Sequence, residues 1–318
     1  MLRVFRSLAD VPAGLPPSAL TIGNFDGVHF AHQRIMQRVV EVARERGLVP
    51  SVLTFHPHPT KVVAPARAPR LLSTPEQRLA WMESLGIEQV FLLPFDKSFS
   101  EISAEDFIHR LVVDRLHARA VLVGWNFHFG HKQSGNTEML VKLGKESGFY
   151  TEIIPGVQLR HVWVSSSEVR TQVEKGNVSL ACRLLNRPYF LEGRIVTGHG
   201  VGAKQTVPTL NLATDAEVLP AKGVYITRTE DLQTGRRWPS ITNIGTRPTF
   251  GGDSLSVETF LLEPLEGHAP EQIRLYFLRR VREERRFESP ELLKAQIFKD
   301  VSVARKLFLR LQRAGVGQ

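Results

Sequence analysis

Residues 23–32, GNFDGVHFAH, join a short apolar run at residues 19–23 to an amphipathic stretch at residues 33–46. The apolar residues of that stretch recur every three or four positions, which predicts a strand, a loop and a helix in succession. His29 and His32 are three residues apart, so at a helix start they are expected on one face. Because the first N–H groups of a helix are free and carry partial positive charge, this loop is a candidate phosphate site.

The alternation of strand and helix continues through the first half of the chain. Further strands are expected at residues 49–55, 90–93, 120–124 and 150–154, and helices near residues 104–117 and 137–147. A further helix should start at Thr74, because Pro75 fits its first position and Gln77 completes a capping box. The pattern predicts a doubly wound, mostly parallel α/β sheet of Rossmann-like type, with ligands at the carboxyl ends of its strands.

The second half has a different pattern. Strand-length segments with Gly and Pro punctuation follow one another through residues 190–277 without a helical period. Residues 290–313 then form one amphipathic helix, whose expected core face is Leu293, Ile297, Val301, Ala304, Phe308 and Leu311. We therefore predict an antiparallel β-barrel with a C-terminal helix, and two domains at residues 1–186 and 187–318.

Composition narrows the functional classes. The chain has 318 residues, 42% hydrophobic residues, a net charge of +9 and a single cysteine, Cys182. No apolar run approaches the ~20 residues that a membrane-spanning helix needs, and no secretory signal is recognised. A cytoplasmic location with no membrane partner is expected. Basic residues alternate with acidic ones at residues 279–286, RRVREERR, which is typical of a solvated face, so no nucleic-acid partner is predicted.

The loop at residues 23–32 suits adenylyl transfer. Gly23 and Gly27 allow the backbone to approach a phosphate closely. In adenylyl transfer the nucleophile is an anionic phosphate, so the site needs charge stabilisation and a held leaving group rather than a base. Residues 165–170, SSSEVR, offer capping hydroxyl groups and an arginine one turn later that could reach a triphosphate.

The barrel half carries a second set of polar residues. Thr209 and Asn211 alternate along a strand and point to the same side, where their oxygens could bind Mg²⁺ together with ATP. Glu258 lies in another strand and is the candidate general base, because a neutral hydroxyl nucleophile must lose a proton.

The first half resembles the nucleotidylyltransferase half of the bacterial bifunctional riboflavin kinase/FMN adenylyltransferase family. Beyond residues 23–32, the resemblance covers residues 54–59 (TFHPHP), 71–74 (LLST), 123–130 (VGWNFHFG) and 165–170. It implies that His29 and His32 bind the ATP phosphates in catalysis. The further implied ATP contacts are Gly23, Asn24, Phe25, Gly27, Ser166, Ser167 and Arg170, and the implied flavin contacts are Phe55, Pro57, Asn126 and Phe127.

The second half resembles the riboflavin kinase module of the same family, through residues 208–211 (PTLN), 222–225 (KGVY), 244–250 (IGTRPTF) and 282–287 (REERRF). The resemblance implies Mg-ATP at Thr209 and Asn211, Glu258 as base, and Arg282 near the flavin. Gly198 and Lys204, in and just after a glycine-rich segment, are the remaining candidate ATP contacts. The implied substrates are riboflavin, FMN and ATP, with Mg²⁺ as cofactor and flavins as substrate and product.

Two alternatives stay open at this point. The chain departs from the family pattern at Ala31, Asn126 and Leu210, and at residues 203–206, so that one activity alone, more readily the kinase, could have been retained. The other alternative is a non-catalytic, basic protein that binds nucleotides or RNA. The oligomeric state is not predicted.

Overall fold

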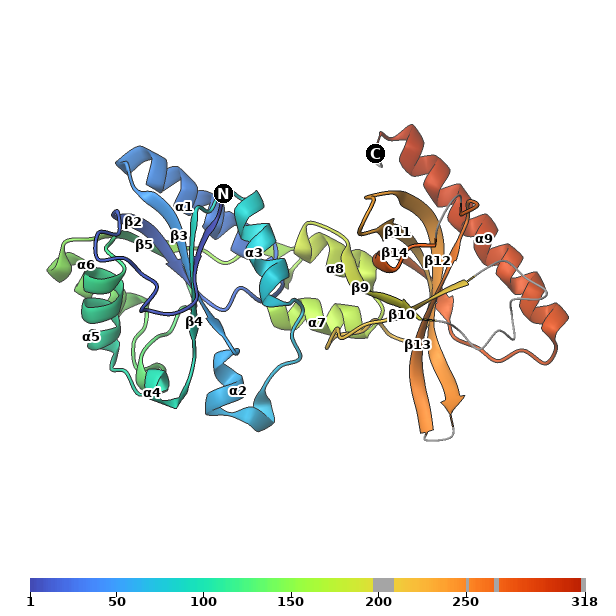
Figure 1. The fold of residues 1–318 in the computed structure, drawn as a ribbon, viewed down its shortest axis with the longest axis horizontal. Coiled ribbons are helices and arrows are strands. Elements are labelled where there is room, and N and C mark those ends of the chain that lie inside the picture. The colour runs from blue at the N-terminus through green and yellow to red at the C-terminus, as the bar shows by residue number, and fades with distance from the viewer. Residues whose placement is uncertain (197–208, 250–251, 266–268, 316–318) are drawn as a thin grey trace. The chain divides into compact units, whose positions relative to one another are not determined.

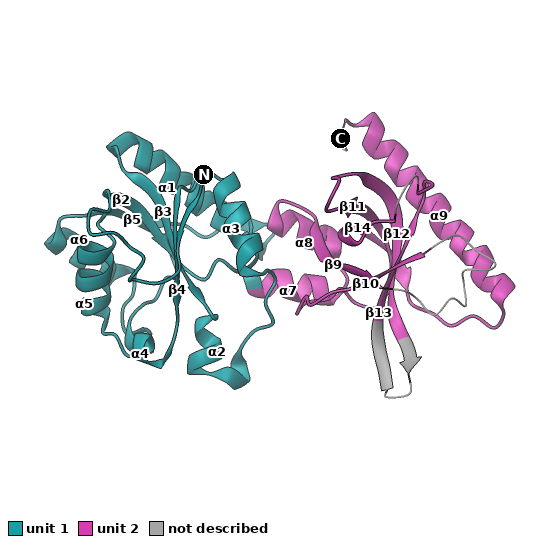
Figure 2. Cartoon of the chain, in the orientation of Figure 1, with its two compact units in different colours: residues 1–166 teal, residues 167–318 magenta. Residues whose placement is uncertain are grey.

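A computed structural model describes residues 1–196, 209–249, 252–265 and 269–315. The chain folds into two compact units, Met1–Ser166 and Ser167–Gln318 (Figure 2). This division places the two helices that follow residue 165 with the barrel, whereas the sequence-based boundary at residues 186 and 187 groups them with the first half. That boundary between functional domains stays a prediction.

The first unit is built on a six-stranded sheet with the order β1-β4-β3-β2-β5-β6 (Figure 1). Its strands are β1 (Arg3–Phe5), β2 (Ser18–Ile22), β3 (Val49–His56), β4 (Gln89–Pro94), β5 (Ala118–Gly124) and β6 (Tyr150–Ile154). All neighbouring strands are parallel. The predicted doubly wound sheet is confirmed, and the chain changes direction across the sheet between β2 and β5, which is where ligands bind in such folds.

Helices cover both faces of this sheet. They are α1 (Phe30–Arg46), α2 (Pro59–Val63), α3 (Pro75–Ser84), α4 (Lys97–Ser100), α5 (Ala104–Asp106) and α6 (Thr137–Ser147). Met36 and Val39 of α1 lie in one apolar cluster, and Leu140 of α6 lies in the other. The helix expected at residues 104–117 is α5 continued by a π-helix, Phe107–Arg115. In a π-helix the hydrogen bonds join residues five apart, as in the bond from Leu116 N to Leu111 O at 2.9 Å.

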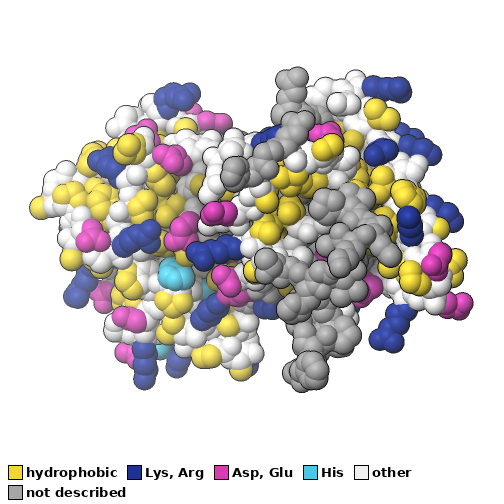
Figure 3. Space-filling model, turned by 45° about the vertical axis from the view of Figure 1, so that its right-hand side comes forward, with side chains coloured by type: hydrophobic (Ala, Val, Ile, Leu, Met, Phe, Trp, Pro, Cys, Tyr) yellow, Lys and Arg dark blue, Asp and Glu magenta, His cyan; other side chains and the backbone are white. Residues whose placement is uncertain are grey.

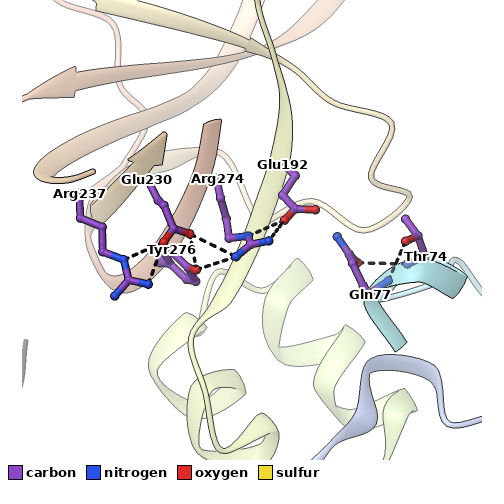
Figure 4. A network of polar contacts seen from close by, with 7 residues as sticks. All are labelled: Thr74, Gln77, Glu192, Glu230, Arg237, Arg274 and Tyr276. Atoms are coloured by element: carbon purple, nitrogen blue, oxygen red, sulfur yellow. Dashed lines mark hydrogen bonds and ion pairs between the residues drawn. The ribbon is translucent and has the colours of Figure 1, made fainter. Parts of the chain in front are cut away.

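The start of α3 follows the sequence signal closely. Thr74 Oγ1 accepts a hydrogen bond from Gln77 N at 3.2 Å, and Gln77 Oε1 accepts one from Thr74 N at 3.1 Å (Figure 4). Pro75 occupies the first turn. The predicted capping box is therefore confirmed.

The second unit begins with α7 (Ser166–Glu174) and α8 (Val178–Leu185) and continues as a closed barrel with the order β10-β13-β12-β11-β14-β9. The strands are β9 (Tyr189–Val196), β10 (Thr209–Ala213), β11 (Gly223–Asp231), β12 (Arg237–Thr249), β13 (Gly252–Leu261) and β14 (Gln272–Glu283). All pairs are antiparallel. The barrel and the terminal helix α9 (Pro290–Arg313) agree with the sequence prediction.

The two faces of the barrel wall have different chemistry. Val224, Ile226 and Ile241 pack against Ala304 of α9, so they mark the outer face. The opposite face lines the interior with buried hydroxyl groups that bond to one another, as in Thr227 Oγ1 to Ser240 Oγ at 2.8 Å. The amphipathic face predicted for α9 is only partly buried: Val301, Ala304 and Phe308 pack on the barrel, whereas Leu293 and Ile297 are exposed. Helical periodicity gives the face of a helix but not how much of its length has a partner.

An alternating row of charges crosses four barrel strands (Figure 4). Glu192 pairs in register with Arg274, and Arg274 pairs in register with Glu230. Glu230 Oε1 lies 2.8 Å from Arg237 NH2, and Glu230 Oε2 accepts a hydrogen bond from the Tyr276 hydroxyl at 2.7 Å. Burial alone would raise the pKa of Glu230, but Tyr276 and the two arginines outweigh it and lower that pKa from its ordinary value of 4.5. These ion pairs connect the neighbouring strands β9, β14, β11 and β12.

We expect Arg274→Met to lower the free energy of unfolding by about 2 kcal/mol, between the values typical of exposed and buried ion pairs. The pKa of Glu230 is lower in the folded state, so its contribution is present above a pH of about 4.5 and is lost as the pH falls through the folded value. The free energy of unfolding of the variant should therefore fall less than that of the wild type when the pH is lowered. Urea unfolding followed by circular dichroism at neutral and acid pH measures both effects. Arg237→Met, at the more exposed end of the row, is the matched control and should cost less; equal stability of Arg274→Met and wild type would contradict the argument.

Candidate functional site

The loop between β2 and α1 has an unusual backbone. It contains a short 3₁₀ turn, Asp26–Val28, and Phe25, Gly27 and Val28 all have positive φ values of 50°, 73° and 36°. A positive φ is strained for a β-branched residue such as Val28, so the surrounding structure must hold it in place. Strain of this kind concentrates at functional sites, and this loop lies at the carboxyl end of the sheet's central strand β2.

The two histidines predicted to share a face are stacked. The ring centroids of His29 and His32 are 3.5 Å apart with an interplanar angle of 19°. His29 caps α1 because its Nδ1 accepts the His32 N–H at 3.3 Å, and the ring of Phe25 meets His32 edge-on at 5.1 Å. His29 is only 4% exposed. The prediction that the pair lies at the start of a helix is confirmed: the His29 ring accepts an N–H group of the first turn, and the His32 ring stacks on it.

Asp26 holds the loop in its conformation. Its carboxylate is buried and accepts hydrogen bonds from Leu72 N at 3.0 and 3.1 Å and from Ser73 Oγ at 3.1 Å. Ser73 Oγ in turn accepts the N–H of Gly27 at 2.9 Å. A methyl group at Gly27 would lie 2.9 Å from the Leu72 side chain, so a side chain at this positive-φ position would be strained and crowded. The LLST segment of residues 71–74 thus supports the loop from outside it.

Arg78 is a second support that the sequence prediction missed. It is buried, and its guanidinium group donates to the backbone oxygen of Asn24 at 2.7 Å and to Thr54 Oγ1 at 3.2 Å. Burial lowers the pKa of Arg78, while the charges of Asp26 and Glu76 act in the opposite direction. On α3 this arginine occupies an ordinary helical position, so only the three-dimensional structure shows that it joins the β2–α1 loop to the end of β3.

Ser166 also contacts the loop, since its hydroxyl donates to the backbone oxygen of Asp26 at 2.9 Å. Ser166 is the last residue of the first unit and the first of α7. Ser167 and Arg170 belong to the second unit, where Arg170 NH1 donates to Ser167 Oγ at 3.4 Å. Of the predicted ATP contacts near residue 165, the structure places Ser166 against the histidine loop.

The predicted flavin contacts lie at the ends of β3 and β5. Phe55 is buried near the end of β3, Pro57 follows it after a cis peptide bond, and Asn126 and Phe127 follow β5. Phe55 and Phe127 belong to one chain of ring contacts with centroid separations between 5.3 and 6.3 Å. Its members are Phe55, Phe95, Phe99, Phe107, Phe129 and Phe127. The predicted contacts therefore border a continuous aromatic cluster.

On the barrel, three polar residues form one row across neighbouring strands. Glu258 of β13 pairs in register with Asn211 of β10 on one side and with Asn243 of β12 on the other. Directly opposed residues in antiparallel strands have side chains on the same face, about 4.5–5.5 Å apart at Cβ. Ile241 lies two residues from Asn243 along β12, so the row is on the outer face, the face covered elsewhere by α9. Asn243 was not among the predicted site residues, because its role depends on strand register.

Thr209 lies at the exposed start of β10, opposite Phe260 and two residues from Asn211. It shares the face of the row, as predicted. Arg282, on β14, donates from Nε to Asp300 Oδ2 of α9 at 2.9 Å, and Asp300 is buried. The Glu284 carboxylate lies against Gly245, where an added methyl would come within 2.1 Å of it. Gly198 and Lys204 fall outside the described residues.

Charges of both signs are mixed on the surface drawn in Figure 3, where Lys and Arg side chains lie among Asp and Glu side chains. Within the described ranges, His, Cys, Asp and Glu side chains form no group of three or more suited to a metal ion. None of the described helices combines the length and apolar character that crossing a membrane requires.

Two family models match successive parts of the chain. Residues 12–168 match the family model for FAD synthetase, and residues 185–308 match the model for riboflavin kinase. Proteins named bifunctional riboflavin kinase/FMN adenylyltransferase are similar over most of the chain. The protein of Pseudomonas fluorescens is 36% identical and covers 90% of this chain and 92% of its own length. That of Escherichia coli K12 is 34% identical over 97% of both chains, and that of Haemophilus influenzae is 32% identical, over 96% of this chain and 99% of its own.

A solved structure is similar over nearly the whole chain as well. It is described as a macrolide-efflux protein from Streptococcus pneumoniae, with a TM-score of 0.85 and 26% sequence identity, and the match covers 95% of this chain and 98% of that one. The match in fold thus extends across both units described above.

Proposed function

The chain belongs to the bifunctional riboflavin kinase/FMN adenylyltransferase family, and we propose that the β2–α1 loop performs its adenylyl transfer and the outer face of the barrel its phosphorylation. The protein uses ATP to convert riboflavin into FMN and FMN into FAD. The observation that carries the assignment of sites is the stacked histidine pair at the start of α1, held by Asp26 and Ser166.

In adenylyl transfer, a phosphate oxygen of FMN attacks the α-phosphorus of ATP, and the bond to pyrophosphate breaks. No proton has to be removed from the ionised nucleophile. His29, His32 and the first N–H groups of α1 stabilise the charge that develops on the transferred phosphate and on the leaving group. Gly23, Asn24, Phe25 and Gly27 shape the backbone around the triphosphate, with Ser166, Ser167 and Arg170 as further contacts. Phe55, Pro57, Asn126 and Phe127 orient the flavin.

In the kinase reaction, the terminal hydroxyl of the ribityl chain attacks the γ-phosphorus of ATP, and ADP leaves. The hydroxyl is neutral, so Glu258 accepts its proton as the new bond forms. Asn211 and Asn243 flank this carboxylate in register and orient it. Arg282 is held by Asp300 at the edge of the same face, where it contacts the flavin.

Mg²⁺ is proposed as the cofactor of the kinase site. The side-chain oxygens of Thr209 and Asn211 lie on one face of β10, which fits a hard cation that takes few protein ligands and keeps several waters. When bound with ATP, the ion neutralises phosphate charge. A cytoplasmic location, the absence of a nucleic-acid partner and the division at residues 186 and 187 remain predictions.

Purified protein incubated with riboflavin and Mg-ATP is expected to yield FMN first and then FAD, resolved by chromatography. FMN supplied in place of riboflavin should give FAD directly, because both sites are present in the chain. Formation of FMN without FAD, even from added FMN, would support retention of the kinase alone. If no turnover occurred but RNA bound in a salt-sensitive way, the non-catalytic alternative would be correct.

A further inference from the structure

Arg78 lies inside the first unit, at the junction of two segments that the proposed adenylyl transfer uses. It extends from α3 and is only 6% exposed. Its NH1 donates to the Asn24 carbonyl at 2.7 Å and to Thr54 Oγ1 at 3.2 Å, and its NH2 donates to the Phe55 carbonyl at 3.4 Å. One guanidinium group therefore holds both the backbone of the phosphate loop and the backbone of the segment that leads to the predicted flavin contacts.

The contact lies where the two segments leave their shared ladder. β2 and β3 pair in parallel as far as Ile22 and Leu53. Beyond this point β2 turns into the loop, whereas β3 continues beside β4. The Asn24 carbonyl, two residues after the last paired residue of β2, accepts hydrogen bonds from Arg78 and from Thr54 Oγ1, the latter at 3.3 Å. Side chains thus maintain the spacing that strand pairing sets further down the sheet.

Arginine suits this position by its shape, although burying it is costly. Its planar group presents several N–H donors in a fixed fork that can meet acceptors from two segments at once, whereas lysine carries a single point charge. Burial lowers the pKa of Arg78, and the charge of Asp26 acts in the opposite direction. Desolvating a charged group costs free energy that an apolar side chain of similar length would not cost. What distinguishes Arg78 here is therefore its fork of donors, which fixes two backbones relative to one another.

We propose that Arg78 is a positioning residue of FAD formation, which sets the spacing between the loop that holds the ATP phosphates and the segment that orients the flavin. This inference rests on the proposed adenylyl-transfer site. The FMN phosphate oxygen must approach the α-phosphorus of ATP in line and to about 3–3.5 Å, and a misplacement of about 1 Å can lower the rate roughly 10²-fold. Arg78 acts through the backbones of Asn24 and Phe55 and takes no part in bond making or breaking.

The test removes the fork of donors and keeps an unbranched side chain. In Arg78→Met, kcat for FAD formation from supplied FMN should fall by roughly 10²-fold, while the KM values for ATP and FMN change by less than about threefold, because each substrate keeps its own contacts. Arg78→Lys keeps the charge but not the fork, so it should recover only part of kcat. Riboflavin phosphorylation should stay at the wild-type rate in both variants, because its residues lie in the second unit.

Arg115→Met is the matched control. The Arg115 guanidinium also donates to two backbone carbonyls, those of Leu8 and Val11, neither of which belongs to the phosphate loop or to β3. Its loss should lower the temperature of thermal unfolding, measured by circular dichroism, as the loss of Arg78 does, yet leave kcat for FAD formation unchanged.

A second variant covers the case in which Arg78→Met does not fold. Thr54→Val removes the hydroxyl that links the Asn24 carbonyl to Arg78 while it keeps the shape and charge of the side chain, and it should lower kcat for FAD formation roughly fivefold, the effect of one lost hydrogen bond. A normal kcat in folded Arg78→Met or in Thr54→Val would overturn the proposal, as would an equal loss of kcat in Arg115→Met.

A rise in the KM of one substrate at unchanged kcat would also overturn it, because Arg78 would then serve one substrate and not the spacing between two. Failure of the wild type to make FAD would count instead against the proposed function itself.

Discussion

A protein with His29→Asn and His32→Asn is expected to lose FAD formation by roughly 10³-fold or more, while it still phosphorylates riboflavin within about threefold of wild type. The two rings stack at 3.5 Å at the start of α1. The double variant therefore takes both imidazole rings away from the place where the charge of the leaving pyrophosphate develops in the proposed reaction. Asparagine is chosen because it remains a good N-cap at position 29, where alanine would cost about 1 kcal/mol of helix stability. The measurement is the rate of FAD formation from supplied FMN, set beside the rate of FMN formation.

The control uses another histidine of the same unit. His109 lies on the π-helix and its Nδ1 hydrogen-bonds to Ser147 Oγ at 3.1 Å. His109→Asn should leave both rates near those of wild type. Loss of both activities in a folded His29→Asn/His32→Asn protein would show that the two reactions do not have independent sites. Retention of FAD formation would remove the histidines from the proposed mechanism.

The fold was largely predictable because its signals are local. Continuous apolar runs mark the buried parallel strands, and the capping box at Thr74 marks the start of α3. Two elements did not follow from local signals. Helical spacing in α9 predicted Leu293 and Ile297 in the core, but barrel contacts begin only further along the helix. Pro239 lies within the pairing of β11 and β12, although proline usually argues against a paired strand.

The candidate sites were predictable where a motif is contiguous and were missed where residues meet from distant segments. His29 and His32 could be paired from their spacing alone. Arg78 and Asp26 stabilise the same loop through contacts with residues far away in the sequence, and neither contact has a periodic signature. Asn243 lies beside Glu258 only because β12 and β13 pair in this register. A shift of the register by one residue would turn every side chain of the strand to the other face, and the sequence alone does not give the register.

Glu258→Gln is expected to slow riboflavin phosphorylation by roughly 10²–10⁴-fold, or about 3–5 kcal/mol of transition-state stabilisation. Glutamine keeps the size and most hydrogen bonds of the residue between Asn211 and Asn243, but it cannot accept the proton of the ribityl hydroxyl. Because the lost interaction belongs to the transition state, kcat should fall while riboflavin affinity changes little. Steady-state kinetics with riboflavin, together with equilibrium binding of riboflavin, separate the two.

The same variant should still make FAD from supplied FMN at the wild-type rate, since a phosphate nucleophile needs no base. Glu263→Gln, an exposed glutamate just past the end of β13, is the matched control and should leave both reactions unchanged. In phosphoryl transfer the bond to the leaving group is largely broken before the hydroxyl loses its proton, which favours the lower end of the expected range. A Glu258→Gln enzyme that phosphorylates riboflavin within about threefold of wild type would show that proton removal does not depend on this carboxylate, and the row of Asn211, Glu258 and Asn243 would then serve to bind ATP and its metal ion only.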